Sequence, residues 1–430
     1  LDSIQSKIIE LENRMKRIKL VSLITSISDI TINLTDKMLY QDVSGFEKKP
    51  LKYDLPSLYW IFANLCFIIE KNCYFFLFDK NEPQFLIMYE HLYGNNVNKK
   101  KTYDISKFEN INVLIIYYQD LIKKIKLKIN KTENIAEKEI YLINNSMHYN
   151  SNANEKMIQI YKLLETDVSL LYTHKFFSSS IPIKKFEWIT LLGGYFIQGS
   201  DSSNIYVPDN QKPPFKKFVK SFQITSEVVT VGQYMEFIEN GGYFKEELWT
   251  KNGWEWKIDN DIICPLYWKK KGSIWFIQSF SKEKYLSINL NLPIENISWF
   301  EAMAFAKWAD ARLPFEIESK FCATNRGKTE FPWGSDKPDI NKNNIEFKYP
   351  GAIDIKTNNK GKNLYNIFNM IGNVWEWCLD SYLPYNNFSM DILNSCINYN
   401  NFSKKKYVLK GGSWISSRYF INPRYRMGLK

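Results

Sequence analysis

The sequence predicts an α+β protein built from two domains. Residues 1–180 form a mostly helical domain, and residues 181–430 form a loop-rich domain with low regular secondary structure. Apolar residues recur at helical spacing in the first part. In the second part, short apolar runs alternate with Gly, Pro and Asn turns, and most of the tryptophans lie there. The serines at 178–180, followed by Pro182, predict the boundary, since a chain of 430 residues is too long for one small core.

The first helix carries an apolar stripe with the spacing of a heptad repeat. Its members are Ile4, Ile8, Leu11, Met15 and Ile18, with charged residues between them. Packing of this stripe on its own domain is the favoured interpretation, because a seam of about two and a half heptads rarely associates alone. The alternative is a short coiled coil over residues 1–20 that makes the protein an oligomer through its N-terminal helices.

Three further segments show helical patterns. Residues 56–71 predict a buried apolar helix, and residues 110–129 and 154–173 also have helical spacing. Residues 73–93 fit either a hairpin or a helix. The Asn and Lys clusters at 94–101 and 144–155 predict loops.

The same patterns bear on location. The apolar run 55–69 is shorter than the ~20 residues that span a bilayer. We therefore expect a soluble protein without a transmembrane segment or a visible signal peptide, and the sequence does not indicate its compartment.

Charge and metal-ligand residues exclude some function classes. The net charge is +11, but the lysines are scattered along the chain, so nucleic-acid binding is not expected. None of the six cysteines lies in a Cys-x-x-Cys pair, which disfavours a zinc cluster and indicates free buried thiols. The three histidines are His91, His148 and His174, and no two of them share a helical turn.

Two tryptophan blocks are the strongest motifs in the chain. Residues 372–378 read Gly-Asn-Val-Trp-Glu-Trp-Cys, and residues 411–414 read Gly-Gly-Ser-Trp. Gly372 permits a tight turn, and Gly411 with Gly412 lets two backbone segments approach closely. Large rings at alternating positions hold long loops that lack regular ladders.

From Phe186 onward the chain resembles the formylglycine-generating-enzyme (sulfatase-modifying factor) family. The resemblance rests on the two tryptophan blocks and on segments 193–200, 222–230, 293–314 and 331–334. Within 293–314, apolar residues at helical spacing predict a helix from Trp299 to Ala309, and Arg312-Leu313-Pro314 precedes another helix. The resemblance implies a C-type-lectin-like fold whose surface is built from loops.

The resemblance also implies catalytic residues that this chain does not carry. Oxidases of the family bind Cu(I) with two cysteines, and their positions fall on Ser416 and Ile421. A second branch makes sulfoxides with a non-haem iron held by three histidines, including a His-x-x-x-His pair that is missing here. We therefore expect no catalytic residues and no catalytic cofactor.

Calcium is the one metal that the resemblance leaves open. Asn373 and Glu376 could supply oxygen ligands to a structural Ca²⁺, as family members often do near this loop. Alternatively, Asn373 caps the turn and Glu376 makes a local hydrogen bond.

The sequence therefore predicts a non-catalytic recognition protein whose loops bind a protein or a small molecule. Aromatic, Arg and Asn side chains are typical of contact surfaces. The candidate ligand-binding residues are Trp254, Trp256, Trp414, Ser416, Arg418, Tyr419, Phe420, Asn422 and Arg424. One alternative is a metal-dependent oxidoreductase of the same family with atypical site residues, for which Ser416, Arg424 and Glu376 are candidates. In another, the N-terminal helices couple the protein to a partner.

Overall fold

The chain forms two compact units. The computed structural model describes residues 2–40, 58–77, 111–163, 186–201, 207–272, 274–278, 285–287, 289–349, 351–355, 357, 359–389 and 402–430. The helical unit comprises Leu1–Leu164 with Ser203–Pro208 and Met390–Asn400; the loop-rich unit comprises Glu165–Ser202, Asp209–Ser389 and Asn401–Lys430. The predicted boundary at residue 180 lies outside the described residues and stays a prediction.

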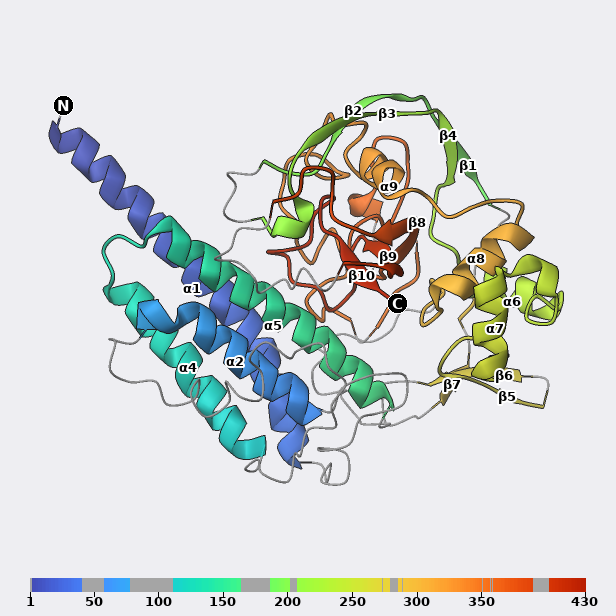
Figure 1. Ribbon diagram of the computed structural model, residues 1–430, viewed down its shortest axis with the longest axis horizontal. Coiled ribbons are helices and arrows are strands. Elements are labelled where there is room, and N and C mark those ends of the chain that lie inside the picture. Colours follow the sequence, from blue (N-terminus) through green and yellow to red (C-terminus); the bar gives the residue numbers. More distant parts are fainter. Residues whose placement is uncertain are drawn as a thin grey trace. The chain divides into compact units, whose positions relative to one another are not determined.

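Among its described residues, the helical unit contains the helices α1 (Asp2–Tyr40), α2 (Leu58–Leu77), α4 (Ile111–Lys131) and α5 (Glu137–Leu163) (Figure 1). Each of α1 and α2 packs against both α4 and α5, so the helices enclose a common core. The predicted apolar helix near 56–71 is confirmed as α2, and residues such as Phe62 and Leu65 are fully buried. Of the ambiguous segment 73–93, residues 73–77 are helical and the rest lies outside the described residues, as does the predicted loop 94–101.

Helix α5 corrects the prediction of a loop at 144–155. The asparagines of this segment point into the core and bond there: Asn150 and Asn154 each accept a hydrogen bond from the Thr31 hydroxyl, at 2.7 and 2.9 Å. The amide of Asn72 donates to the hydroxyl of Ser146 at 3.0 Å. Asparagine competes with helical backbone bonds when it is exposed, but tertiary partners remove that competition.

The heptad stripe was expected to pack on its own domain, and this interpretation is also wrong for the stripe residues whose side chains are described. Ile8, Leu11, Met15 and Ile18 are between 52% and 61% exposed, whereas Leu20, Leu23 and Ile24 on another face are buried. The core thus uses the second half of α1. Arg17 holds the helix near the α4–α5 connection by donating to the carbonyl oxygens of Thr132 and Glu133.

One described helix segment, Lys7–Thr35, passes the length and composition test for a helix that could cross a membrane. Core helices and signal sequences share this length and composition, and part of this segment is buried within the helical unit.

The described residues of the loop-rich unit form four small antiparallel sheets. Strand β1 (Trp188–Leu191) pairs with β4 (Phe222–Thr225), and β2 (Gly194–Gln198) pairs with β3 (Phe215–Val219). Strands β5 (Trp268–Lys271), β6 (Ile274–Gln278) and β7 (Tyr285–Ser287) form a third sheet. The fourth has the order β10 (Met427–Leu429), β9 (Ser403–Lys410), β8 (Glu376–Tyr382), so the chain end pairs beside the second tryptophan block.

Short helices complete this unit: α6 (Val231–Glu239), α7 (Lys251–Asp259), α8 (Trp299–Trp308) and α9 (Glu316–Ala323), with single 3-10 turns η3 (Asp209–Gln211), η4 (Glu246–Leu248) and η5 (Asn359–Gly361). Ser298 and Glu301 form a capping box that fixes the start of α8, and α8 matches the predicted helix closely. Its Phe305 packs in a cluster with Tyr234, Phe237 and Trp249. The α+β class is confirmed, and the five cysteines among the described residues are free thiols.

Candidate functional site

The two tryptophan blocks meet in space. The backbone N–H of Gly372 donates to the carbonyl oxygen of Gly411 at 2.9 Å, and that of Trp414 donates to the carbonyl oxygen of Asn373 at 2.9 Å. In the β8–β9 ladder, Glu376 lies opposite Lys410. Residues that are about 35 positions apart in sequence therefore form one local structure.

Gly412 explains why the second block needs glycine. Its φ is +80°, and a Cβ there would lie 2.6 Å from Cδ1 of Ile421 and 3.2 Å from Oγ of Ser416. The side chains of Ser416 and Ile421 therefore converge on the same point above Gly412. These are the two positions that the family resemblance assigned to copper-binding cysteines.

The residues at these positions do not fit a copper ion. The Ser416 hydroxyl accepts a hydrogen bond from the backbone N–H of Ser413 at 2.9 Å and is buried. Ile421 packs with Ile345 and Ile371. A hydroxyl is a poor ligand for Cu(I), and an isoleucine side chain is none.

A histidine iron site is not formed by the described residues either. His148 is buried in α5, and burial lowers its pKa to about 4. His91 and His174 lie outside the described residues. Within the described ranges, no group of three or more His, Cys, Asp or Glu side chains is placed to hold a metal ion.

Asn373 serves the fold. Its side-chain oxygen accepts hydrogen bonds from the amide of Asn344 at 3.0 Å and from the backbone N–H of Ile353 at 2.9 Å. Its amide nitrogen donates to the carbonyl oxygen of Ile353 at 3.1 Å. The φ of Asn373 is +67°, a conformation that asparagine tolerates well. These bonds match the capping alternative, and the calcium site stays a prediction.

Glu376 is a carboxyl group in a protected position. It remains partly exposed as a residue, yet burial of its carboxyl raises its pKa from 4.5 to about 8. One of its carboxyl oxygens lies 3.8 Å from the place of a Cβ at Gly411. Glu376 therefore holds a proton at neutral pH beside the Gly411–Gly412 turn. A pKa shifted in this way is of the kind found at functional sites.

Trp254 and Trp256 of α7 belong to the packing of the loop-rich unit. Both are partly buried against the cluster that contains Tyr234 and Trp249. The ring centroid of Trp256 lies 5.6 Å from that of Phe300, and the ammonium of Lys257 lies 4.8 Å from the Trp254 ring. These contacts tie both rings to the unit that carries them.

The segment 414–424 is held by several internal contacts. Trp414 is buried with its ring edge toward Phe347, and Phe420 is buried as well. Nε of Arg418 donates to the carboxylate of Glu346 at 2.7 Å. The side-chain oxygen of Asn422 accepts from the backbone N–H of Arg424 at 2.8 Å, closing a turn. Tyr419 is partly exposed.

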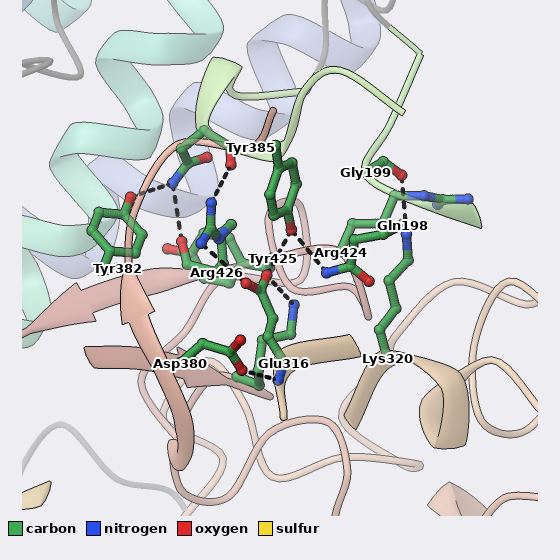
Figure 2. A network of polar contacts seen from close by, with 12 residues as sticks. Gln198, Gly199, Glu316, Lys320, Asp380, Tyr382, Tyr385, Arg424, Tyr425 and Arg426 are labelled. Atoms are coloured by element: carbon green, nitrogen blue, oxygen red, sulfur yellow. Dashed lines mark hydrogen bonds and ion pairs between the residues drawn. The ribbon is translucent and has the colours of Figure 1, made fainter. Parts of the chain in front are cut away.

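A buried network of charged residues was not predicted from the sequence (Figure 2). Its centre is the Glu316 carboxylate at the start of α9. Nη2 of Arg426 lies 3.0 Å from it, the hydroxyl of Tyr385 donates to it at 2.6 Å, and Nζ of Lys410 lies 4.0 Å away. The Asp380 carboxylate accepts the backbone N–H of Glu316 at 2.6 Å. The only sequence signal was the charge of residues next to the motifs, because the partners are about 70 to 110 residues apart.

Comparison with known proteins identifies relatives among enzymes. The chain is 29% identical to hercynine oxygenase from Mycolicibacterium smegmatis over 54% of its own length and 55% of the relative's. It is 25% identical to formylglycine-generating enzyme from Thermomonospora curvata, over 45% of this chain and 70% of the relative. It is also 25% identical to inactive C-alpha-formylglycine-generating enzyme 2 from Mus musculus, over 53% and 74%.

These relatives overturn two predictions. The matches to hercynine oxygenases, at 28–29% identity, contradict the prediction of a non-catalytic recognition protein and of a chain that is not an enzyme. The chain spans about half the length of these hercynine oxygenases. The protein-family model described as the sulfatase-modifying factor enzyme 1-like domain matches residues 179–429, more than half of the chain. This protein therefore belongs to the sulfatase-modifying factor enzyme 1-like family.

Proposed function

We propose that this protein is an oxidoreductase that uses molecular oxygen to oxidise a small substrate. The observation that carries the proposal is the similarity to hercynine oxygenases over about half of the chain. The name hercynine oxygenase describes those relatives as whole proteins. For this chain, the name supplies only the class of reaction that the experiment tests.

The chain's own residues support a site at the junction of the two tryptophan blocks. The junction brings Glu376, the Gly411–Gly412 turn and Ser416 close together. Reduction of oxygen consumes protons, and Glu376 keeps one at neutral pH because burial raises its pKa to about 8. We assign to Glu376 the role of holding and donating a proton. General acid groups work best when their pKa lies near the working pH.

No metal is assigned, because the copper positions carry Ser416 and Ile421 and the described residues form no ligand set. Metal content is therefore measured and not assumed. The purified full chain would be analysed for copper and iron before each assay and again after incubation with either metal.

Oxygen uptake tests the proposal. Hercynine with cysteine, and separately a cysteine-containing peptide, would be supplied to the full chain in an oxygen electrode, with products identified by mass spectrometry. We expect substrate-dependent oxygen uptake with an oxidised product. Glu376→Gln would lower the rate by about a hundredfold or more, the usual scale for loss of a general acid.

Glu330→Gln is the matched control, because Glu330 is exposed and undergoes the same isosteric change. It would keep the wild-type rate. No uptake above background with either substrate class, in protein loaded with either metal, would count against the oxygenase reading.

A further inference from the structure

The buried network around Glu316 has too little negative charge. Four basic side chains belong to it or lie within its electrostatic reach: Lys320, Lys410, Arg424 and Arg426. The pKa of Lys320 is lowered to about 6, so three of the four carry a positive charge at neutral pH. Their acidic counterparts are Glu316 and Asp380, and one Asp380 oxygen already accepts the backbone N–H that begins α9. Buried charges are ordinarily paired, since an uncompensated charge in a protein interior is costly.

Lys320 shows this imbalance most clearly. Its Nζ donates to the carbonyl oxygens of Ile197 at 3.2 Å and Gly199 at 3.0 Å, so among the described residues it has neutral acceptors and no direct carboxylate partner. Burial, and then the neighbouring charges of Arg424 and Lys410, lower its pKa to about 6. Arg424 itself is partly exposed, and its guanidinium has no hydrogen bond or ion pair to any described residue.

A second observation, independent of the charges, is a set of polar atoms that have no hydrogen-bond partner among the described residues. They are buried and lie on residues within the network or next to it in sequence: Gln198 Oε1, Ser200 Oγ, Asn210 Oδ1, Gln211 Oε1, Gln211 Nε2, Lys410 Nζ and Arg426 Nε. Seven such atoms in one region are unusual, because most buried polar groups are satisfied. Two of them, on Lys410 and Arg426, are charged donors.

The excess of positive charge and the unpartnered polar atoms both indicate a negatively charged ligand. Oxygen atoms that carry negative charge would accept from Lys410 Nζ, Arg426 Nε and Gln211 Nε2 and would offset the excess of cations. Hydroxyl or protonated oxygens on the same ligand could serve the acceptors of Gln198 and Asn210. Arginine and lysine together recognise carboxylate and phosphate oxygens well.

We propose that the Glu316–Arg426 network is a binding site for a small oxyanion, a carboxylate or a phosphate, with Arg424 at its partly exposed side (Figure 2). The site adjoins the Glu376 junction through Lys410, which lies opposite Glu376 in the β8–β9 ladder, but the proposal does not depend on oxygenase activity. The oxyanion is either a free inorganic ion or the acid group of an organic molecule.

Titration calorimetry on the full chain tests the proposal, with sodium phosphate and sodium acetate as probes against sodium chloride at constant ionic strength. We expect saturable binding of at least one probe with about one site per chain. Phosphate alone would indicate the inorganic ion, and acetate would indicate a carboxylate group of an organic ligand. Either result supports the site.

The variant that decides is Arg424→Met, because this side chain has no partner whose loss would disturb the fold. Its Kd would rise by about tenfold or more, as loss of one charge-assisted contact predicts. Lys220→Met, at an exposed lysine with the same charge change, would keep the wild-type Kd. The proposal is overturned if neither probe saturates, or if both variants bind with the wild-type Kd. Oxygen uptake by Arg424→Met, measured separately, shows whether the site also serves the reaction.

Discussion

At the scale of single residues, the junction brings together the two positions that the family resemblance assigns to copper-binding cysteines, but it fills them with other residues. The side chains of Ser416 and Ile421 converge over Gly412, although neither can bind Cu(I). The resemblance identified these positions from spacing alone. Their mutual approach could not be read from the sequence, since it depends on the positive φ of Gly412.

This convergence makes a direct prediction. The double variant Ser416→Cys with Ile421→Cys places two thiols over Gly412, and we expect it to bind one Cu(I) ion per chain, because paired thiolates select this ion. Competition with a colorimetric Cu(I) chelator measures the affinity. Each single variant is a matched control and would bind at least about tenfold more weakly than the pair. Equal affinity of the pair and the singles would show that the two side chains do not converge.

Glu376 predicts a pH dependence of stability. Its pKa is raised from 4.5 to about 8 in the folded state, so the native protein binds this proton more tightly than the unfolded chain does. The resulting stability is present below pH 4.5 and is lost as pH rises through about 8. Glu376→Gln removes the titration, and its free energy of unfolding would equal that of wild type near pH 5.

At pH 8 the Gln variant would be more stable than wild type by about 1–2 kcal/mol, less than full burial would give, since water reaches part of the residue. Urea unfolding at pH 5 and pH 8 measures both values, with Glu330→Gln as the control. A difference that shrinks toward alkaline pH would contradict the assignment.

At the scale of elements, the two halves of α1 lie in different environments. The bundle buries its second half, while the heptad stripe of its first half stays exposed. The stripe was visible in the sequence, but its environment was not, because the same spacing suits an internal core and a coiled coil. The segment 144–155 of α5 was wrongly predicted as a loop for the opposite reason: its asparagines look like a loop until the Thr31 hydroxyl provides their partner.

The exposed stripe predicts self-association through α1 in a parallel coiled coil. In the heptad that places Ile8 and Met15 at a, Lys7 falls at g and Glu12 at e, so each would face its opposite charge across a parallel dimer. We expect a dimer by sedimentation at micromolar concentrations. Leu11→Glu would shift it to monomer by placing a charge at a d position, whereas Glu10→Gln, outside the seam, would not. A wild-type monomer at all concentrations would exclude this interface.

At the scale of the whole molecule, local patterns and long-range contacts contributed differently. Helical spacing was enough to place α2 and α8, because this signal is carried by apolar residues within a few positions of one another. Family membership followed from the tryptophan blocks. The Glu316–Arg426 network could not be foreseen, because β2, η3, α9, β8 and the chain end supply it from separate parts of the sequence. The prediction of a non-enzyme failed for a related reason: missing ligands at known positions do not exclude chemistry by other residues.

The pairing of Glu376 with Lys410 in the β8–β9 ladder has a thermodynamic consequence. One rung joins a residue that binds a proton to a residue of the proposed anion site. If filling the anion site changes the proton affinity of Glu376 by some factor, protonation of Glu376 must change the anion affinity by that same factor. The pH dependence of anion binding and the anion dependence of the Glu376 pKa would then be two measurements of a single coupling free energy.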